Sequence, residues 1–484
     1  MRRFATIAAW LLAPAMFVTM LFVTGPANLM GDFRSFYCAG DTIAHGANPY
    51  LEEPLHACER RARSVLLPGT LASVTLPAPL PPSSLVLYVP LSRLPFPLAA
   101  LVYGLLLLAA MNVAIALLAR ATGVSSLVLN LAFAAIASTQ IYFLGQPMPF
   151  VFLAFAATAL LLRSERWWAG TGCMMVATIE PHLALPALVA MAIALPKTRL
   201  PILAGCALLS LASVMTVGLA TSIAYVRDVI PAHALANAYE WQYSLTSILT
   251  SLGVDGPAAV RAGEAMYAAM VAAGVAVAYR LWKRTGDVTA IVLVPPAFAV
   301  FGGVHVHQHQ LAIAFPAILA VHAHYPRLRT LAATGLSFAM IPWNMMSASV
   351  MTGFTPLLVG WFARSTMGAR RGLVLTVIAA VIAVSVLALA LDGMGPGTAQ
   401  YVVRSYPPGA LAEQSWGDFS RAELARQSIL MQWLRVPVLV GLALGLLAVT
   451  RAAFGASTIA GRVHDYGADL RVAGKPTYAD ATIS

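Results

Sequence analysis

The segment after the first apolar run carries the residues best suited to chemistry. It begins Gly31-Asp32-Phe33 and continues through Phe36 and Tyr37. On a helix, Asp32 and Phe36 share one face and Phe33 and Tyr37 share another. A carboxylate among aromatic rings at a water–lipid boundary loses hydration, which raises its pKa and suits it to act as a general base. The plainer alternative is that Asp32 caps a helix that begins at Phe33.

Three alternating histidines, His305, His307 and His309, form a second group. In an extended loop all three lie on one face, whereas on a helix only His305 and His309 do. A metal ion would need a defined geometry and supporting partners around these rings. We favour contact with phosphate or sugar oxygens, because imidazoles serve as hydrogen-bond donors. A third interpretation is a polar helix cap at the membrane interface.

Other polar residues interrupt apolar sequence. Gln146 lies in a predicted Gly-Gln-Pro turn, and Glu180 and His182 lie inside an apolar stretch. Ionisable groups within a membrane are costly and mark functional sites, unless a hairpin tip simply reaches outer water. Trp241 and Tyr243 predict either a sugar-binding loop for an acceptor or an interfacial aromatic belt. A later segment carries further sugar-compatible residues, namely Tyr401, Arg404, Tyr406, Glu413, Trp416 and Asp418.

The chain has four cysteines. Cys38 and Cys58 share the first predicted outer loop, where an oxidising compartment permits a disulfide. Whether it forms depends on a Cα separation that the sequence leaves open. Cys173 and Cys206 lie in apolar spans and are expected to be buried small hydrophobes. No cysteine spacing predicts a zinc site.

The elements that position these residues are membrane helices. Hydrophobic residues make up 60% of the chain, charged residues only 10%, and the mean hydropathy is +0.78. A soluble domain has about 25% charged residues, so lipid is the expected solvent. The net charge of +11 comes from scattered basic residues between apolar stretches, which is typical of membrane topology and not of nucleic-acid binding. No glycine-rich nucleotide motif and no Gly-x-Ser-x-Gly motif appears.

Apolar runs predict an all-α polytopic protein of about 12–14 transmembrane helices. The pair 167–180 and 182–196 predicts a re-entrant or broken hairpin, and 351–363 is the weakest span. The expected spans are approximately 4–24, 95–119, 124–143, 147–162, 167–180, 182–196, 200–220, 263–281, 288–303, 309–324, 329–347, 351–363, 373–391 and 429–450.

The charge pattern predicts the orientation. With the N-terminus in the cytoplasm, most basic residues fall in short inner segments and most acidic residues fall outside. Prolines between 77 and 97 predict a rigid, extended crossing or a short surface helix over 83–94. We predict one transmembrane domain over 1–450 and a polar cytoplasmic tail over 451–484. Three outer loops are long, at about 25–94, 221–262 and 392–428.

Taken in order, several motifs resemble the polyprenyl-phosphate-dependent mannosyltransferases of glycosyltransferase family 87, which have the GT-C fold. The resemblance covers most of residues 30–320 and rests on Asp-Phe-x-x-Phe-Tyr-x-Ala-Gly at Asp32–Gly40, Gly-x-x-Pro-Tyr at Gly46–Tyr50, Pro81-Pro82, the stretch from Pro90 to Pro95, Gly145-Gln146, and the histidine-bearing turn followed by Pro316. The family often has Lys-Pro where this chain has Glu180-Pro181. This departure puts in doubt whether a cation binds the donor phosphate in this chain. His182 is the candidate to replace that cation, and Glu180 is a candidate second acid.

The resemblance implies a mechanism and its partners. Asp32 takes the proton of an acceptor hydroxyl, the oxygen attacks the anomeric carbon, and a polyprenyl phosphate leaves with inversion. Arg34, His307 and His309 are expected to stabilise the phosphate, and the remaining donor-binding residues are Tyr37, Gln146, His182 and His305. A hexose, mannose in the first instance, moves to a glycolipid or glycan at the outer face of the plasma membrane. The mechanism demands no metal and no other cofactor.

Other functions remain open at this stage. A lipid or sugar transporter would show paired ionisable groups at the membrane midplane and two symmetric halves, and neither is evident. A non-catalytic assembly subunit would retain the fold without the chemistry. A pentosyl donor is a variant of the leading hypothesis, and pocket shape decides between donors.

Overall fold

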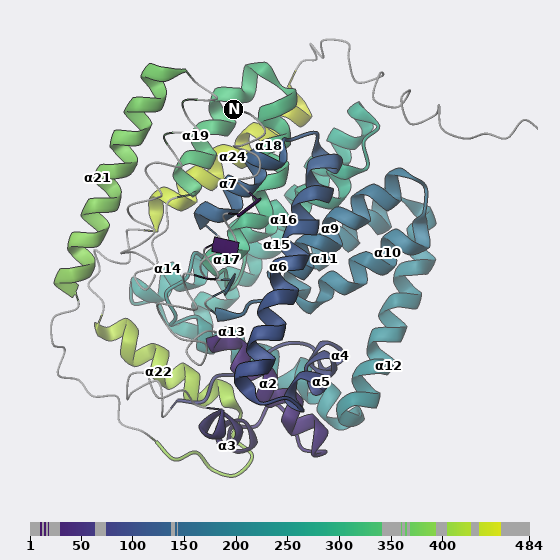
Figure 1. Cartoon of the computed structure of the whole chain (residues 1–484), viewed down its shortest axis with the longest axis vertical. Helices are drawn as coiled ribbons and strands as arrows, with labels where there is room; N and C mark the ends of the chain where they lie inside the picture. The colour runs from purple at the N-terminus through teal and green to yellow at the C-terminus, as the bar shows by residue number, and fades with distance from the viewer. Residues whose placement is uncertain are drawn as a thin grey trace, which may run out of the picture.

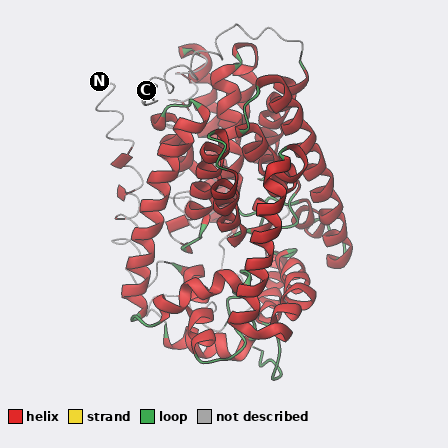
Figure 2. Ribbon diagram, turned by 90° about the vertical axis from the view of Figure 1, so that its right-hand side faces the viewer, coloured by secondary structure: helices red, strands yellow, loops and turns green. Residues whose placement is uncertain are grey.

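The protein is built almost entirely from helices (Figures 1 and 2). The computed structural model describes residues 10–11, 14–15, 18, 30–62, 74–136, 141–142, 144–340, 360, 364, 368–393, 404–426 and 435–455. Within these ranges there is no β-strand, and the only extended pairing is a bridge between Leu51 and Leu411. A helix satisfies its own backbone hydrogen bonds, which lipid cannot do. The prediction of an all-α polytopic membrane protein is confirmed.

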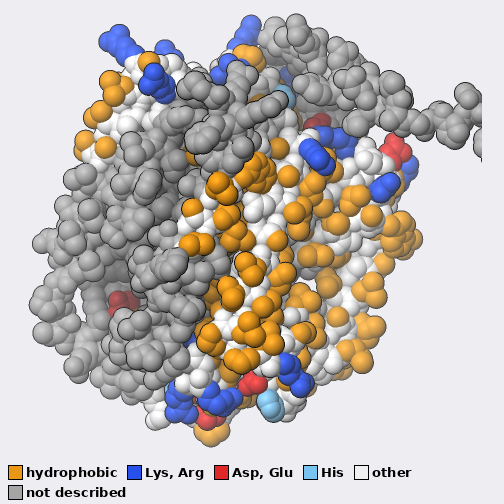
Figure 3. All heavy atoms as spheres, viewed as in Figure 1, with side chains coloured by type: hydrophobic (Ala, Val, Ile, Leu, Met, Phe, Trp, Pro, Cys, Tyr) orange, Lys and Arg blue, Asp and Glu red, His pale blue; other side chains and the backbone are white. Residues whose placement is uncertain are grey.

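Four helices among the described residues are long and apolar enough to cross a membrane. They are Phe96–Thr122 (α6), the continuous stretch Pro196–Asn237 that contains Arg199–Ala224 (α12), Gly256–Thr285 (α15) and Val436–Phe454 (α24). Leu107 of α6 is buried, whereas Leu105 and Leu106 on the same turn face outward. A helix that is apolar on its outward face as well belongs in lipid. Figure 3 shows hydrophobic side chains across the middle of this face and Lys and Arg near its two ends.

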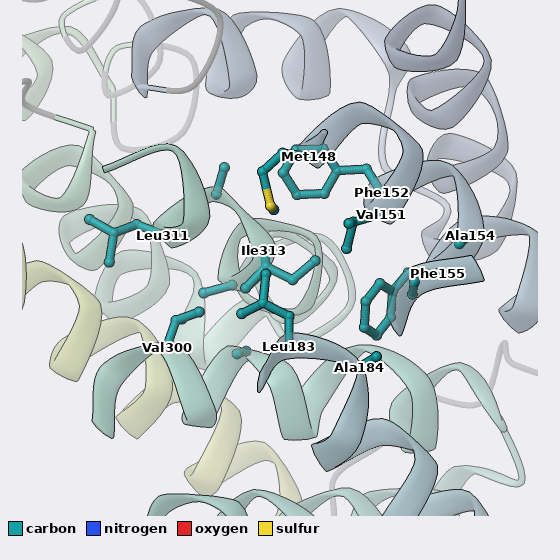
Figure 4. Close-up of a cluster of buried hydrophobic side chains, with 14 of the residues drawn as sticks. Met148, Val151, Phe152, Ala154, Phe155, Leu183, Ala184, Val300, Leu311 and Ile313 are labelled. Atoms are coloured by element: carbon teal, nitrogen blue, oxygen red, sulfur yellow. The ribbon is translucent and has the colours of Figure 1, made fainter. Parts of the chain in front are cut away.

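Further helices complete the bundle. They are Ser126–Ile136 (α7), Met148–Arg163 (α9), Trp167–Val176 (α10), Pro181–Ala194 (α11), Thr289–Gly302 (α16), Gln308–Leu311 (α17), Phe315–His324 (α18), Arg329–Ala339 (α19) and Ala369–Gly393 (α21). Side chains of α9 and α11 meet Leu311 and Ile313 in a buried apolar core (Figure 4). Helices α19 and α24 cross with their backbones in contact, because a Cβ on Gly335 would lie 2.5 Å from the nitrogen of Gly445. Small residues allow such close packing in membranes.

Helices α10 and α11 form the expected hairpin. Helix α10 has 10 residues and is therefore about 15 Å long, half of the hydrocarbon core of a bilayer. It packs on α9 and α12, while α11 packs on α16 and α15. Glu180 at the tip is only 7% exposed. The tip is therefore largely enclosed by the protein, and Glu180 lines a cavity there.

The second long outer loop, expected over 221–262, is largely helical. The helix that contains α12 bends at Gly218 and continues through a π-turn at Tyr225–Val229 into Ile230–Asn237 (α13). Pro231 cannot donate a backbone hydrogen bond, and the π-turn before it accommodates this loss within a continuous helix. A short helix, Leu245–Ser251 (α14), follows before α15 begins at Gly256. Gly218 has a non-helical φ of 81° and ψ of 163°, so the helical backbone is interrupted close to the expected end of a span at 220 and then resumes.

The inner segments expected from the charge pattern meet at one end of the bundle. Arg163, at the end of α9, donates to the carbonyl of Ala121 at 2.7 Å and to the carboxylate of Asp287 at 3.0 Å. Arg284, at the end of α15, donates to the carbonyls of Ala452 and Ala453 at 2.9 Å. These cations lie at helix C-termini, where the backbone dipole favours positive charge.

Shorter helices form a cap at the opposite end of the bundle, lowest in Figure 1. They are Gly31–Ala44 (α2), Glu52–Arg61 (α3), Pro82–Leu85 (α4), Val86–Tyr88 (η2), Val89–Ser92 (α5), α13 and Ala412–Arg426 (α22). A disulfide between Cys38 and Cys58, with Cα atoms 5.5 Å apart, joins α2 to α3. Residues 75–81 are extended as their prolines predicted, and short helices over 82–92 follow them.

Hydrogen bonds tie this extended segment to its neighbours. The hydroxyl of Tyr225 donates to the carbonyl of Pro79 at 3.0 Å, and that of Tyr50 donates to the carbonyl of Leu80 at 2.9 Å. An extended chain has no internal backbone partners, so such bonds are needed to fix it. Of the expected elements, span 351–363, most of span 4–24 and the tail beyond 455 lie outside the described residues.

We predict that thiol labelling will detect the disulfide and report on the side of the membrane that the cap occupies. Denatured protein from cell membranes should label at Cys173 and Cys206 only, and at all four cysteines after reduction. The bridge closes a loop of 20 residues and should stabilise the protein by about 3 kcal/mol. The double variant Cys38→Ser/Cys58→Ser should therefore melt at a lower temperature. Four labelled cysteines before reduction would contradict the bridge and an oxidising environment for the cap.

Candidate active site

A cavity of about 300 Å³ lies where the cap meets the bundle. The extended segment supplies Pro77 and Pro79 to its wall, and α2 supplies Phe36. Its polar lining comes from segments far apart in the chain, and consists of Asp32, Gln146, Glu180, His182, His233, Asn237, Glu240, Glu264, His305, His307, Gln310 and Trp416. Seven of the residues singled out from the sequence are among them.

Asp32 lies in the first turn of α2 and faces the cavity, partly buried. Helix α2 begins at Gly31, and the residue at its cap position is Met30, with a left-handed φ of 70°. The alternative that Asp32 caps a helix beginning at Phe33 is therefore wrong. The Nε2 of Gln146 donates a hydrogen bond to Oδ2 of Asp32. The carboxylate is held by a neutral amide and remains open to the cavity.

The turn before Gln146 must contain glycine. Gly145 has a φ of 75°, and a Cβ on it would lie 2.6 Å from the Cβ of Phe33 and 2.7 Å from the Sδ of Met30. Gly145 therefore lets the turn lie directly against α2. Phe33 in turn stacks on Tyr103 of α6, with ring centres 4.3 Å apart. These contacts fix Gln146 beside Asp32.

Burial of Asp32 raises its pKa to about 6, because a charged carboxylate loses hydration in the cavity. The positive charge of His307 lowers the pKa, and the negative charge of Glu240 raises it. The hydrogen bond from Gln146 and the charge of Arg34 lower it to a smaller extent. The result suits a general base near neutral pH, since Asp32 is ionised above about pH 6 and still basic enough to take a proton.

The histidine segment is a loop that turns into a helix. Residues 303–307 are not helical, and α17 begins at Gln308. His305 and His307 line the cavity, whereas His309 is 1% exposed and its ring lies parallel to that of His307, 5.6 Å away. The expected three-histidine face is thus broken after His307.

Two glutamines fix this loop. The Oε1 of Gln242 accepts from the backbone N–H of Val306 at 2.9 Å. The Oε1 of Gln310 accepts from the backbone N–H of His307 at 2.9 Å, and its Nε2 donates to Glu180 at 3.3 Å. An amide carries both a donor and an acceptor, so each glutamine joins two elements without adding charge.

Three imidazoles and a carboxylate cluster at one part of the cavity. The ring centre of His305 lies 4.8 Å from that of His182 and 5.3 Å from that of His233. The Nδ1 of His182 is 3.6 Å from Oε2 of Glu180. One ring nitrogen of each of the three histidines is buried without a hydrogen-bond partner. Unsatisfied buried nitrogens are costly and indicate a place for a polar ligand.

Glu240 joins several side chains in a second part of the cavity. Its Oε1 is 3.9 Å from Nδ1 of His307, and its Oε2 accepts from Nε1 of Trp416 at 3.4 Å and from Nε2 of Gln242 at 3.3 Å. Sequence reasoning passed over Glu240 in favour of its aromatic neighbours, although a lone acidic residue in an aromatic outer segment was a usable signal. His233 gave no such signal, because it fell in the predicted outer loop over 221–262, where a single polar residue is unremarkable.

Several expected residues lie outside the cavity lining. The hydroxyl of Tyr37 donates to the carbonyl of Leu94 at 2.9 Å, and Arg34 is buried in α2. The ring of Trp241 faces the guanidinium of Arg435, 5.8 Å away. Tyr243 is 2% exposed, and its backbone N–H donates to Val306 at 2.9 Å. The structure gives these residues packing and support contacts, and the segment that contains Trp241 and Tyr243 reaches the cavity through Glu240.

The charge of the cavity is unusual for a site that would bind an anion. Among the described lining residues there are four carboxylates, four histidines and neither Lys nor Arg. The described residues contain no group of three His, Cys, Asp or Glu arranged to hold a metal ion. Positive charge in the cavity therefore depends on protonation of its histidines.

We predict that Gly145→Ala will lower the free energy of unfolding by about 2 kcal/mol or more. A residue with a Cβ is strained at positive φ, and this Cβ would also overlap α2. Thermal unfolding in detergent measures the effect. Gly253→Ala tests the backbone strain alone, because Gly253 has a φ of 87° and open space around it. Gly172→Ala, in helix α10 with nothing within 4 Å, should stabilise the protein by up to about 1 kcal/mol, because Ala is the better helix former. Equal melting temperatures for the Gly145 and Gly172 variants would contradict the close contact.

Comparison with known proteins finds a similarity to one family over part of the chain. Residues 80–300 match the model of glycosyltransferase family 87. No curated protein and no solved structure gives a match. The matched range is shorter than the resemblance over residues 30–320. It contains the cavity residues Gln146, Glu180 and Glu240 but not Asp32. Residues 80–300 of this all-α membrane protein are therefore similar to glycosyltransferase family 87, and this similarity indicates a glycosyltransferase.

Proposed function

We propose that the protein moves a hexose, mannose in the first instance, from a polyprenyl-phosphate donor to a glycolipid or glycan at the outer face of the membrane. The observation that carries this proposal is Asp32, ionisable near neutral pH and oriented by Gln146 inside a polar cavity. Similarity to the family supports sugar transfer, and the proposal adds the donor, the acceptor class and the side of the membrane.

A lipid-linked donor fits the helix that contains α12. Over most of its length this helix exposes large apolar side chains, including Leu203 at 68% and Met215 at 78%. Its last turns line the cavity with Tyr225, Ile230 and His233. A polyprenyl chain lying along the apolar part would bring its phosphate to the polar end. Burial of the chain against such a surface is favourable by about 0.8 kcal/mol per CH₂ group.

In the proposed reaction Asp32 takes the proton from the acceptor hydroxyl. The acceptor oxygen forms a bond to the anomeric carbon, and the bond from that carbon to the phosphate oxygen breaks. The polyprenyl phosphate leaves with the electron pair, and the single displacement inverts the anomeric centre. His307 is placed to stabilise the negative charge that grows on the phosphate. Of the residues expected in this role, Arg34 and His309 lie outside the cavity, and their influence would be electrostatic.

We predict that Asp32→Asn will lower transfer by about 10²–10⁴-fold, the usual contribution of a general base. Purified protein in liposomes would receive polyprenyl-phosphate carrying radiolabelled mannose and a bacterial lipid extract, and label in a new product would be counted. Asn still accepts the hydrogen bond from Gln146, so the fold should be retained. Asp41→Asn is the matched control on the same helix, because Asp41 pairs with Arg61 at 3.1 Å away from the cavity. Equal transfer by wild type and Asp32→Asn would exclude Asp32 as the base, and no transfer by wild type from any lipid-phosphate sugar would contradict the proposed function.

We predict that kcat/KM will fall as the pH decreases through about 6, because Asp32 must be ionised to act as the base. Glu240→Gln removes a negative charge that raises the pKa of Asp32, so the fall in kcat/KM should occur at lower pH. Gln146→Leu removes a hydrogen bond that lowers the pKa of Asp32, so the fall in kcat/KM should occur at higher pH. Glu53→Gln, on the exposed side of α3, is the charge-matched control. Shifts in the opposite directions would show that a group other than Asp32 controls the fall in kcat/KM.

A further inference from the structure

Trp416 reaches the cavity from a part of the chain far from the other lining residues. It lies on α22, beyond both the family match over 80–300 and the histidine loop. Within the described lining it is the only tryptophan. An indole has a flat apolar face and a polar N–H, a combination suited to ligands that are apolar on one side and polar at the edge.

The cap fixes the position of this indole. Its N–H donates to Oε2 of Glu240, and its ring contacts that of Phe419, 5.4 Å away. Helix α22 packs on α13 and α3. Its start is joined to the first outer segment, because the backbone N–H of Ala412 donates to Tyr50 at 3.0 Å. Such fixed aromatic rings bind with little loss of conformational entropy.

Glu240 places Trp416 on the same side of the cavity as the base. The carboxylate that accepts from Trp416 also acts electrostatically on Asp32. Glu180 and the three clustered histidines make their contacts with one another, with Gln310 and with Asn237. In a single displacement the base contacts the acceptor, and the leaving phosphate lies on the opposite side of the anomeric carbon. Trp416 therefore belongs to the acceptor side.

The charge around Trp416 restricts the acceptor. Glu240 and Asp32 are carboxylates, and no Lys or Arg lies among the described lining residues. An anionic acceptor group buried there would meet like charge from both carboxylates and would compete with Glu240 for His307, 3.9 Å from that carboxylate, which is unfavourable. Hydroxyl groups, by contrast, donate well to carboxylates.

We propose that Trp416 is the platform of an acceptor subsite, on which a neutral sugar residue stacks while Glu240 accepts hydrogen bonds from its hydroxyls. This inference rests on the proposed transfer reaction and names its acceptor class. The terminal residue of the acceptor is a neutral glycoside, and not a phosphorylated sugar or a uronic acid.

Two acceptors and two variants test the proposal. Octyl mannoside and the matching octyl mannuronate, which differ only in one carboxylate, are offered to reconstituted protein with the lipid-linked donor. Wild type should use the mannoside at least about ten-fold better. Trp416→Ala should raise the KM for the mannoside by about ten-fold, the effect of losing one stacking contact, and Trp416→Phe should raise it less. The KM for the donor should rise less than the KM for the mannoside. Trp168→Ala is the control, because Trp168 is 60% exposed on the lipid-facing side of α10.

The outcomes separate this inference from the proposed function. An unchanged acceptor KM in both Trp416 variants, or equal rises for donor and acceptor, would show that Trp416 is only structural. Preference for the uronate would overturn the neutral class, as would donor hydrolysis without transfer to the mannoside. Binding of octyl mannoside to the inactive Asp32→Asn protein, measured by calorimetry with and without Trp416→Phe, gives a readout independent of turnover. Absence of any donor turnover in wild type would instead refute the proposed function.

Discussion

The contact between α2 and the turn at Gly145-Gln146 is the constraint on which the rest of the site depends. A carboxylate removed from bulk water needs a donor, and Gln146 supplies one without introducing a charge. The donor reaches Asp32 only because Gly145 has no side chain between the turn and Phe33. Phe33 anchors the other side of α2 on Tyr103. The position of the proposed base is thus set by packing between a cap helix and two bundle elements.

Polar groups deeper in the protein are connected by the same kind of neutral partner. Gln242 joins Val306 of the histidine loop to Asn237 at the end of α13, at 2.9 and 3.1 Å. Gln310 joins His307 to Glu180 at the hairpin tip. Backbone that is not helical is tolerated at membrane depth only where its polar groups find partners or line a cavity. The loop with His305 and His307 meets both conditions, and this explains how an irregular segment persists between α16 and α17.

The cavity has two chemically different sides, which suits a reaction that joins a lipid-linked donor to a polar acceptor. One side gathers imidazoles with unpartnered nitrogens around Glu180, next to the helix whose outer surface is apolar. The other side gathers Asp32, Glu240 and an indole from the cap. In the proposed reaction, charge develops on the first side and a proton is removed on the second. His307 lies between them and acts electrostatically on both.

The sequence alone indicated that the protein lies in lipid, that it is helical, and which residues were the first candidates for the site. Hydropathy and charge spacing are local properties, so they identified the apolar spans and the basic helix ends, and the Asp32 and Gly145-Gln146 motifs were readable for the same reason. The continuation of a helix from Pro196 to Asn237 was not readable, because hydropathy marks where lipid ends and not where backbone hydrogen bonding ends. His305 and His307 line the cavity and His309 does not, because α17 begins at Gln308. His233, Glu240 and Trp416 join the site through contacts between distant segments, and such contacts exist only once side-chain packing has brought those segments together.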